Sequence, residues 1–513
     1  MPSAQPTKLA SQPVFVYSSF AMPLESPAPL RSYNPFVVVV QDLLDERSAS
    51  VPFPPGETRP SLRRTQRFAN EPLPLLLESY ERYGPVFTLR LFHANGVFAL
   101  GPAANHYMTV SHASNFAYRT SYFRDLMGFA GDGLLTTDGD FHRASRKIML
   151  PAFHHERILS SLDTMLEETS SALEDFVPGT TIDLYAWTRR LALRIAMRAL
   201  FGLDPDGPAA RSIDAAALFE QTLSFYARAY SLRMLRGPLS PWDRQQKATR
   251  ALNRLIYSEI SRRRATGERG EDVLSLLIDA TDEDGQTALT DLQIRDEVMT
   301  LLFAGHDTTT STIAFMFHEL ARHPHVVERL LAEQDTQLAG ALPTPTQLMG
   351  DGLPYLEQTL EETLRLYPPA WIGPRRSVDP FELHGHTVPG GVFVNYCSWA
   401  SHRLPDVFPE PDAFRPERFA PEAKAALERG AYIPFGGGSR TCIGMRFGQL
   451  EIRTIATLIL SRFALAPPPD FRLTIRQMPT ISPREGLPVV VSPRATAPST
   501  PLSKTSVESA TFG

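Results

Sequence analysis

The amino-acid sequence predicts a mainly α-helical fold with a small β part. Apolar residues recur at i, i+3 and i+4 over most of the chain, as they do in amphipathic helices. The longest such stretch runs from about Leu289 to His323, far above the usual helix length, and predicts an axis that crosses the molecule. Strand-like alternation is confined to two places. The other helical segments are 155–176, 181–203, 209–233 and 241–264, and the strand regions are 86–100 and 381–399.

The composition is that of an ordinary globular protein. The chain has 513 residues, of which 43% are hydrophobic and 21% charged, which is enough to bury a large core and to enclose a cofactor. The net charge of -5 gives no indication of nucleic-acid binding. The two cysteines, Cys397 and Cys442, are too few for a disulfide framework or a four-thiolate metal site.

The chain divides into an arm, one large domain and a tail. Residues 1–60 are rich in proline and serine without a sustained period, so we expect an arm that is irregular in part. Residues 493–513 have a similar composition and are expected to form a disordered tail. The stretch 61–492 contains no repeat and no obvious linker, which predicts one domain, and we expect a monomer.

No segment of the sequence predicts a membrane anchor. A spanning helix needs about 20 apolar residues, whereas the apolar run 36–40 is bounded by Pro35 and Gln41. The segment 14–22 is interrupted by polar residues and has only a thin basic flank, unlike a signal peptide. Arginine exceeds lysine, as in many proteins from GC-rich bacterial genomes. We therefore expect a cytoplasmic bacterial protein.

Short sequence signals predict where elements turn or end. The strand region 86–100 contains Asn95-Gly96, a pair typical of a two-residue hairpin turn. Thr290 and Gln293 have the spacing of a capping box at the start of the long helix. Pro324 predicts its end.

The strongest chemical signal is the segment 435–444, FGGGSRTCIG. A helical pattern follows Cys442, so this cysteine is expected just before or at a helix N-terminus, where the helix dipole and free N–H groups favour a thiolate. Three glycines before it permit tight backbone geometry, and Gly444 leaves room for a flat group. Arg440 is suited to a carboxylate partner. The alternative is a buried free cysteine in a glycine-rich loop.

This decapeptide resembles the haem-binding loop of the cytochrome P-450 family. The resemblance covers roughly residues 70–490 and implies the fold of that family, with haem b between the long helix and the helix after Cys442. Cys442 would be the axial ligand of the iron, and a thiolate there donates electron density that favours cleavage of the O–O bond. The fixed positions of the motif are all present: Phe435, Gly438, Arg440, Cys442 and Gly444.

Further motifs follow in the order that the family shows. Glu362 and Arg365 lie three residues apart on one helix face, and alone they would be an ordinary surface pair. They resemble a buried pair that helps to hold the haem loop in the family, and the PERF segment 416–419 adds Arg418 to it. The resemblance therefore implies a structural role for Glu362, Arg365 and Arg418.

Several basic residues resemble the groups that hold the haem propionates. His142 and Arg146 lie four residues apart and match the C-helix of the family, where many members carry tryptophan instead of the histidine. The alternative for this pair is an exposed basic helix face. Arg375 is a further propionate candidate, with its neighbour Arg376 as the alternative. The resemblance assigns contacts with the haem to Cys442, Arg440, His142, Arg146, Arg375, Phe435, Gly444 and Ala304.

The long helix carries AGHDTT, residues 304–309, near its middle. Gly305 weakens a helix interior, and Thr308 can bond back to a preceding carbonyl and bend the helix. A buried, unpaired Asp307 would be costly in this apolar stretch, which favours a functional acid over a solvated one. The segment resembles the groove in which the family activates oxygen, and it implies a proton relay in which Asp307 and Thr308 are catalytic.

The resemblance implies a monooxygenase that inserts one atom of O2 into a hydrophobic small molecule, such as a fatty acid, a terpene or a steroid. The Asp307–Thr308 pair favours this reaction over a peroxide-driven or rearranging haem-thiolate enzyme. It also argues against a non-catalytic haem sensor, which would need no relay. By the same resemblance, the substrate-binding residues are Phe123, Leu126, Met299, Phe303, Trp371, Ile372, Met478 and Ile481.

Electrons are expected to come from a separate protein. The chain has no convincing glycine-rich dinucleotide fingerprint after a strand, and the tail is too short for a reductase domain. A ferredoxin or flavodoxin with its reductase would supply them, and such donors are usually acidic. The resemblance places the basic residues Arg143, Lys147, Arg446 and Arg453 near the thiolate side of the haem, where the donor would dock.

Overall fold

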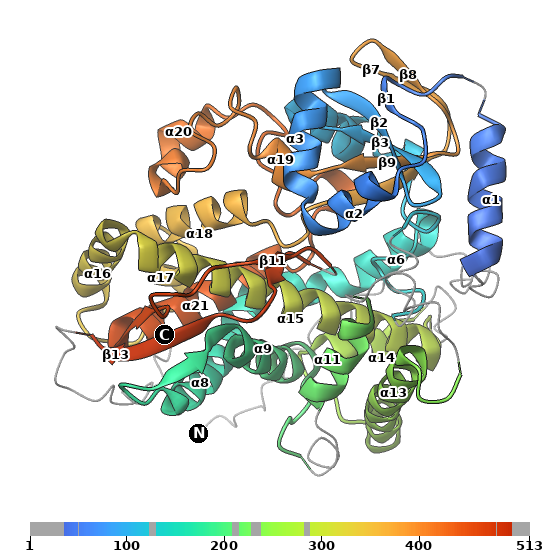
Figure 1. The fold of residues 1–513 in the computed structure, drawn as a ribbon. Coiled ribbons are helices and arrows are strands. Elements are labelled where there is room, and N and C mark those ends of the chain that lie inside the picture. The colour runs from blue at the N-terminus through green and yellow to red at the C-terminus, as the bar shows by residue number, and fades with distance from the viewer. Residues whose placement is uncertain are drawn as a thin grey trace, which may run out of the picture.

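The computed structural model describes residues 35–49, 51–122, 130–207, 215–226, 237–281, 288–478 and 480–494. Helices predominate among them, with one larger sheet and three small ones. Figure 1 shows the larger sheet on one side of the molecule and most of the helices on the other. The mainly α-helical fold with a small β part, predicted from the sequence, is confirmed.

The helices before the long axis lie between residues 35 and 279. Of the predicted helical segments, 241–264 matches α13 closely, whereas 155–176 is divided between two helices. Parts of the predicted segment 209–233 lie outside the described residues. These helices are α1 (Pro35–Arg47), α2 (Leu62–Asn70), α3 (Pro72–Tyr83), α4 (Pro102–His106), α6 (Gly139–Met149), α7 (His155–Ser160), α8 (Leu162–Ala172), α9 (Leu184–Ile195), α11 (Ala215–Tyr226), α13 (Pro241–Thr266) and α14 (Val273–Asp279).

The long helix α15 (Asp291–Arg322) is the axis of the molecule, as the sequence predicts (Figure 1). The Thr290–Gln293 capping box is present at its start, and α16 begins at Pro324 directly after its end. Of its 32 residues, 24 are buried, which is typical of a helix surrounded by other elements. The later helices are α16 (Pro324–Leu338), α17 (Pro345–Met349), α18 (Pro354–Leu366), α19 (Ser398–Ser401), α20 (Pro421–Ala425) and α21 (Met445–Arg462).

The larger sheet has six strands in the order β1-β2-β3-β9-β6-β4. Its centre joins distant parts of the chain, because β3 runs parallel to β9 with Gly96 opposite Phe393. Strand β6 continues the sheet antiparallel to β9 and carries Arg375. The strands of this sheet are β1 (Gly56–Glu57), β2 (Val86–Leu91), β3 (Ala94–Ala99), β9 (Phe393–Tyr396), β6 (Gly373–Ser377) and β4 (Phe116–Ala117).

The predicted hairpin turn at Asn95-Gly96 is wrong. The turn lies at Phe92 and His93, and Asn95 pairs with Arg90 inside the hairpin. Glu46 of α1 holds Asn95 in the strand, accepting hydrogen bonds from its backbone N–H at 3.0 Å and from its side-chain amide at 2.9 Å. Contacts with a helix far away in the sequence therefore override the local turn preference of Asn-Gly.

The predicted helix over 181–203 is wrong for its first residues, because Thr181–Asp183 form a strand, β5. This strand pairs with β13, nearly the last described segment of the chain. The Asp183 side chain then caps α9, accepting from the N–H of Tyr185 at 3.0 Å. Such short strands carry no period of their own. The small sheets contain β5, β10 (Phe463–Ala466) and β13 (Pro488–Pro493), then β11 (Ile475–Arg476) and β12 (Ser482–Pro483), and finally β7 (Phe381–Leu383) and β8 (His386–Val388).

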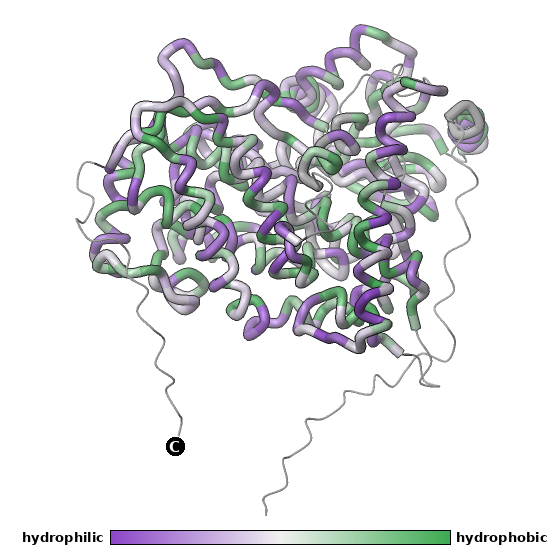
Figure 2. The backbone as a smooth tube through the Cα atoms, turned by 90° about the horizontal axis from the view of Figure 1, so that it is seen from below, coloured by the Kyte–Doolittle hydropathy of each residue, from purple (hydrophilic) through white to green (hydrophobic). Residues whose placement is uncertain are grey.

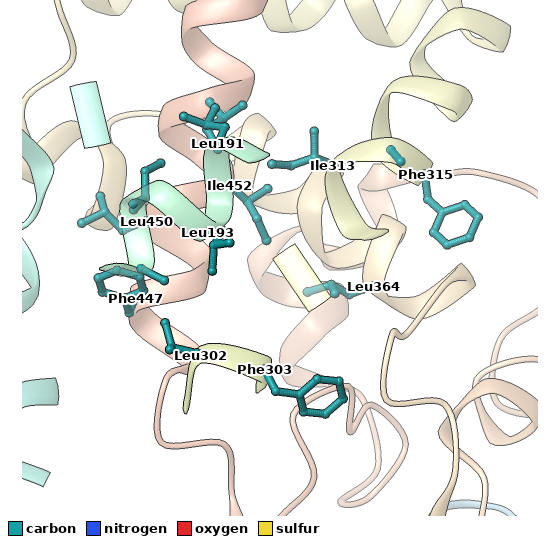
Figure 3. Packing of buried hydrophobic residues seen from close by; sticks show 14 of the residues in the cluster. Leu191, Leu193, Leu302, Phe303, Ile313, Phe315, Leu364, Phe447, Leu450 and Ile452 are labelled. Carbon is teal, nitrogen blue, oxygen red and sulfur yellow. The ribbon is translucent and has the colours of Figure 1, made fainter. Parts of the chain in front are cut away.

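The core gathers around α15 and the helices that touch it. Figure 3 shows side chains of α15 packed among those of α9, α18 and α21. Burial of this apolar surface is the main force that holds the helices together. The labelled residues are Leu302, Phe303, Ile313 and Phe315 of α15, Leu191 and Leu193 of α9, Leu364 of α18, and Phe447, Leu450 and Ile452 of α21.

Along the helices, hydrophilic and hydrophobic residues are interspersed (Figure 2). This is the pattern of amphipathic helices that pack around a core. None of the helices in the described part of the chain is both long and apolar enough to cross a membrane.

Candidate active site

A cavity of about 1080 Å³ lies where α15 faces the loop that leads into α21. Small-molecule pockets alone are usually about 300–1,000 Å³, so this volume suits a cofactor together with a ligand. One wall is the middle of α15, including Ala304, Gly305 and Thr308. The facing wall includes Phe435, Cys442, Gly444 and Phe447.

Cys442 lies just before a helix, as the sequence predicts, because α21 begins at Met445 with Gly444 as its N-cap. The backbone N–H of Cys442 donates to the Phe435 carbonyl at 2.9 Å, which closes the loop. Glycine is required at 438, where φ is +60° and a Cβ atom would come within 2.2 Å of the Thr109 carbonyl oxygen.

The position of Cys442 before a helix predicts a thiolate, but the surroundings of the thiol have a stronger and opposite effect on its pKa. The side chain is exposed to the cavity. Burial within the protein nevertheless raises the pKa of Cys442, against the smaller lowering effects of the Gly444 N–H and the Arg146 charge. A metal cation bound to the sulfur would reverse this direction, since a coordinating thiol is deprotonated.

Cationic side chains meet at one end of the cavity. Arg375 and Arg440 lie over the Tyr118 ring, at 3.4 Å and 4.2 Å from its centroid. Arg440 is paired with Asp138 at 2.6 Å, and Arg375 hydrogen-bonds to the Tyr118 hydroxyl. Burial is the main reason that the pKa of Tyr118 rises to about 12, so this hydroxyl remains neutral at pH 7.

His142 and Arg146 of α6 complete this cationic end. Arg146 donates to the Thr441 carbonyl at 2.7 Å, which ties α6 to the cysteine loop. His142 is buried, and its pKa falls to about 3, first because of burial and then because of Arg440, Arg146 and Arg143. It is therefore neutral at pH 7 and offers a ring N–H rather than a charge. The predicted alternative, an exposed basic helix face, does not describe this pair.

The two neighbouring arginines after α18 point to different places. Arg375 is buried and lines the cavity. Arg376 instead pairs with Asp42 at 3.0 Å and with Asp45 at 2.6 Å, both on α1. Of the two, Arg375 is the one placed to meet an anion in the cavity.

The cavity fits a flat apolar group that carries acidic substituents at one edge. Its faces are apolar on the side of Phe435 and Phe447 and on the side of α15. A Cβ atom at Gly305 would meet nothing within 4 Å, which shows the open space beside α15. Three arginines lie at the edge: Arg146, Arg375 and Arg440. Among the ion pairs of the described residues, Asp138 is their only acidic partner. These donors suit the two carboxylates of a haem.

Thr308 and Asp307 lie next to each other on α15 but face different surroundings. Thr308 lines the cavity and donates to the Ala304 carbonyl at 2.7 Å, the back-bond that the sequence predicts. The Asp307 side chain is directed to the β11–β12 hairpin and to α9 instead. It accepts a hydrogen bond from Thr480 at 2.5 Å and lies 3.3 Å from Arg189.

Asp307 is therefore buried with a hydrogen-bond partner and a cation beside it, which avoids the cost of an unpaired acid. Its partners come from α9 and from a segment more than a hundred residues away, and neither is visible in the local pattern of the helix. The neighbouring His306 is fully buried, and burial lowers its pKa to about 3. This neutral imidazole is buried in the interior of the protein.

Glu362, Arg365 and Arg418 meet in the interior, away from the cavity. Glu362 and Arg365 form a bidentate pair at 2.7 and 2.8 Å, and both are fully buried. Arg418 reaches Glu362 at 3.3 Å. Arg365 also donates to three backbone carbonyls of the segment 402–413, so the network holds the loop that precedes the cysteine segment.

The expected substrate-binding residues separate into three groups. Phe303, Trp371, Ile372 and Met478 line the cavity. Met299 and Ile481 are fully buried and do not line the cavity. Phe123 and Leu126 lie outside the described residues.

The prediction that Arg453 belongs to an exposed basic docking surface is wrong. Arg453 is buried, donates to the Leu348 carbonyl at 2.5 Å and pairs with Glu357 at 3.1 Å. Arg143, Lys147 and Arg446 are exposed, and Arg143 pairs with Asp140.

Several site residues are missed by sequence reasoning. Four of them lie in segments without a motif: Tyr118, Asp138, Arg189 and Thr480. Only the fold brings Tyr118 and Thr480 to the cavity, Asp138 to Arg440, and Arg189 to Asp307. Glu451 is the one with a local signal, since it follows Cys442 on an apolar helix. It accepts from Thr309 at 3.1 Å, and burial raises its pKa to about 8.

Comparison with known proteins assigns this architecture to a family. The family model of cytochrome P-450 matches residues 55–487. A retinoic acid-bound cyanobacterial structure superimposes with a TM-score of 0.77 at 30% identity, covering 87% of this chain and 100% of that chain. Haem with a cysteine thiolate ligand is the cofactor of this family.

Two relatives from Streptomyces melanosporofaciens are also similar along most of their length. Cyclooctat-9-en-7-ol 5-monooxygenase is 32% identical over 448 residues, which is 86% of this chain and 96% of the relative. Cyclooctatin synthase is 35% identical over 369 residues, 71% of this chain and 79% of the relative. The chain therefore belongs to the cytochrome P-450 family and is a haem-thiolate monooxygenase.

Proposed function

We propose that this enzyme hydroxylates an extended hydrophobic substrate of the terpenoid class, with Cys442 as the ligand of the haem iron and with electrons from a separate protein. The observation that carries the proposal is a single apolar cavity with the Cys442 thiol on one wall, Thr308 on the other and three arginines at one edge. Arg146, Arg375 and Arg440 would hold the propionates of haem b, together with His142. Phe435, Gly444 and Ala304 would lie against its faces.

The reaction balances with two electrons and two protons. One oxygen atom of O2 enters a C–H bond of the substrate, and the other leaves as water. The haem, when bound, supplies the iron at which O2 is activated, and the thiolate supports O–O cleavage. The chain's own task is to hold the substrate, exclude water and bring protons to the cavity.

Thr308 is suited to hold a proton-bearing group in the cavity. Its hydrogen is donated to the Ala304 carbonyl, so its lone pairs remain available to the cavity side. It can therefore accept a hydrogen bond from a water molecule or from a protonated oxygen placed there. Asp307 is the acid of the relay, and it must exchange its bond to Thr480 for one toward Thr308 to deliver a proton.

The substrate class is supported by the cavity and by the relatives. The cavity is lined in part by Phe303, Trp371, Ile372 and Met478, which suit an apolar molecule. One relative is a monooxygenase named for cyclooctat-9-en-7-ol, and one similar structure holds retinoic acid. Both compounds are terpenoids, which favours this class over fatty acids and steroids.

The test is a spectral and catalytic screen of the haem-loaded enzyme. Retinoic acid, a diterpene alcohol, oleic acid and testosterone are titrated by the shift of the haem absorption band, and each is then turned over with ferredoxin, its reductase and NADPH, or with hydrogen peroxide alone. We expect the terpenoids to bind most tightly and to be hydroxylated only with the electron donors. Preferred binding of oleic acid or testosterone would contradict the substrate class, and efficient turnover with peroxide would favour the peroxide-driven alternative.

The relay is tested in the same assay with Thr308→Ala. General acid–base groups contribute about 10²–10⁴-fold to rates, so product per NADPH should fall by roughly tenfold or more while hydrogen peroxide rises. Thr312→Ala is the matched control, because Thr312 also lines the cavity on α15 but bonds to the Thr308 carbonyl at 2.9 Å. Unchanged coupling in Thr308→Ala would remove this residue from the relay.

A further inference from the structure

The β11–β12 hairpin both lines the cavity and contacts the segment next to it in the cavity wall. It forms part of the cavity wall, through Gln477, Met478 and Thr480. It is also tied to the neighbouring wall segment, because the Trp371 indole donates to the Gln477 carbonyl at 2.8 Å and the Ile481 N–H donates to the Pro369 carbonyl at 3.1 Å. A ligand that fills this end of the cavity therefore contacts the hairpin directly.

The other side of the hairpin reaches the buried acid of α15. The Thr480 hydroxyl donates to one Asp307 oxygen at 2.5 Å, and the Arg189 guanidinium lies 3.3 Å from the other. Asp307 is 1% exposed and Thr480 5%, so the interaction is shielded from solvent. Hydrogen bonds to an ionised acceptor are stronger than neutral ones, and more so in a low-dielectric interior.

The groups around Asp307 come from three elements. Tyr185 and Arg189 lie on α9, and His306 is its neighbour on α15. Arg476 of the hairpin bonds to the Tyr185 hydroxyl at 3.3 Å. Within this group, Thr480 is the one that bonds directly to Asp307 and also lines the cavity.

We propose that Thr480 is a positioning residue for Asp307, which links the occupancy of the substrate cavity to the acid of the proton relay. The proposal rests on the relay role of Asp307 proposed above. Arg189 draws the carboxylate toward α9, whereas Thr480, which lines the cavity, holds it from the side of the hairpin. A ligand that presses on the hairpin moves Thr480, and the carboxylate bonded to Thr480 is drawn with it from Arg189 toward Thr308. Without the hydroxyl, the carboxylate is left to Arg189 and stays turned away.

The experiment compares Thr480→Val with Thr480→Ser in the haem-loaded enzyme. Valine keeps the shape of threonine without the hydroxyl, and serine keeps the hydroxyl. Retinoic acid is the probe, replaced by the panel member with the largest spectral shift if that is another compound. We measure the binding titration, the product formed per NADPH, and the solvent isotope effect on turnover.

We expect Thr480→Val to bind the probe as the wild type does, to lose several-fold in product per NADPH and to show a larger solvent isotope effect. Thr480→Ser should restore both. A merely structural role of Thr480 would change stability without changing the isotope effect. Wild-type coupling in Thr480→Val, or a Thr480→Ser variant as defective as Thr480→Val, would overturn the proposal.

Asp307→Asn separates this proposal from the one on which it rests. If Asp307→Asn forms as much product per NADPH as the wild type, the relay role of Asp307 itself fails. If Asp307→Asn forms less product per NADPH while Thr480→Val forms the wild-type amount, only the role of Thr480 is refuted. In the double variant, Thr480→Val should add no further loss of coupling to Asp307→Asn. The melting temperature gives a readout without substrate. Thr480→Val should lower it more in the wild type than in the Asp307→Asn background, because the Asn amide oxygen accepts a weaker hydrogen bond than the carboxylate does. Equal effects in both backgrounds would contradict a charge-assisted bond between the two side chains.

Discussion

At the scale of single residues, the environment rather than the residue type sets the chemistry. His142 and His306 are both histidines on helices near the cavity, and burial makes both neutral at pH 7. Cys442 and Cys397 are both thiols whose pKa is raised by burial, but Cys442 is the one that borders the cavity. The two cysteines therefore give a matched pair of variants.

Cys442→Ala should abolish the thiolate signature of the haem, which is the red-shifted absorption band of the reduced protein with carbon monoxide. Cys397→Ala is the control, because Cys397 is fully buried at the N-cap of α19 and does not line the cavity. It should retain the band unchanged. A Cys442→Ala protein that keeps the band would refute the assignment of the ligand.

Glu362→Ala should destabilise the protein by about 3–5 kcal/mol, because removing one partner of a buried pair leaves the Arg365 charge without its counterion. The free energy of unfolding in urea and the haem content of the purified protein measure this loss. Lys247→Ala removes an exposed pair with Asp243 on α13 and should change neither value measurably. A stable, fully haem-loaded Glu362→Ala variant would contradict the structural role of this network.

At the scale of elements, α15 is both the axis of the core and one wall of the cavity. Its first half also holds the segment before α6. Glu297 accepts from the Leu134 N–H at 2.8 Å, and Asp296 accepts from the Asp132 N–H at 2.9 Å. A Cβ atom at Gly133 would come within 2.1 Å of the Thr300 hydroxyl oxygen, so the segment is pressed against the helix.

Glu297 predicts a pH dependence of stability. Burial raises its pKa from 4.5 to about 8, so the folded state retains a proton that the unfolded state releases. The stability due to this group is complete below about pH 4.5 and is lost as the pH rises from there to about 8. Glu297→Gln mimics the neutral acid and should become more stable relative to the wild type across this window. Urea unfolding at several pH values checks this, and a difference that stays constant with pH would contradict it.

At the scale of the whole molecule, the loop of Cys442 lies near one surface that carries basic residues. Arg146 joins α6 to this loop at Thr441, and Lys147 and Arg446 are exposed beside these contacts. An acidic electron donor would be attracted to such a surface even though the chain carries a net charge of -5.

Charge reversal at Lys147 or Arg446 should slow reduction by a ferredoxin severalfold and leave the spectral titration with the substrate unchanged. The rate should also fall as salt is added, because exposed charges are screened over about 8 Å at physiological ionic strength. Lys247→Glu on α13 is the control and should reduce at the wild-type rate. Normal reduction of both variants, without salt dependence, would exclude this surface as the docking site.

The sequence by itself determined the parts of the protein that depend on local order. The period of the apolar residues predicts α13 and α15, and the capping box predicts where α15 begins, because a helix is stabilised by neighbours three and four residues apart. The segment 435–444 and the pair Glu362–Arg365 are also local, so the family and the position of the candidate ligand follow from them.

Only the tertiary structure decided which side chains meet. The hairpin turns at Phe92-His93 and not at the predicted Asn95-Gly96, because Glu46 binds Asn95. The partners of Asp307 are Arg189 and Thr480. The tertiary structure also chose Arg375 over Arg376 for the cavity and buried Arg453. The reason is physical: each of these outcomes is a contact between segments far apart in the chain, and a buried charge takes whichever partner the packing brings within reach.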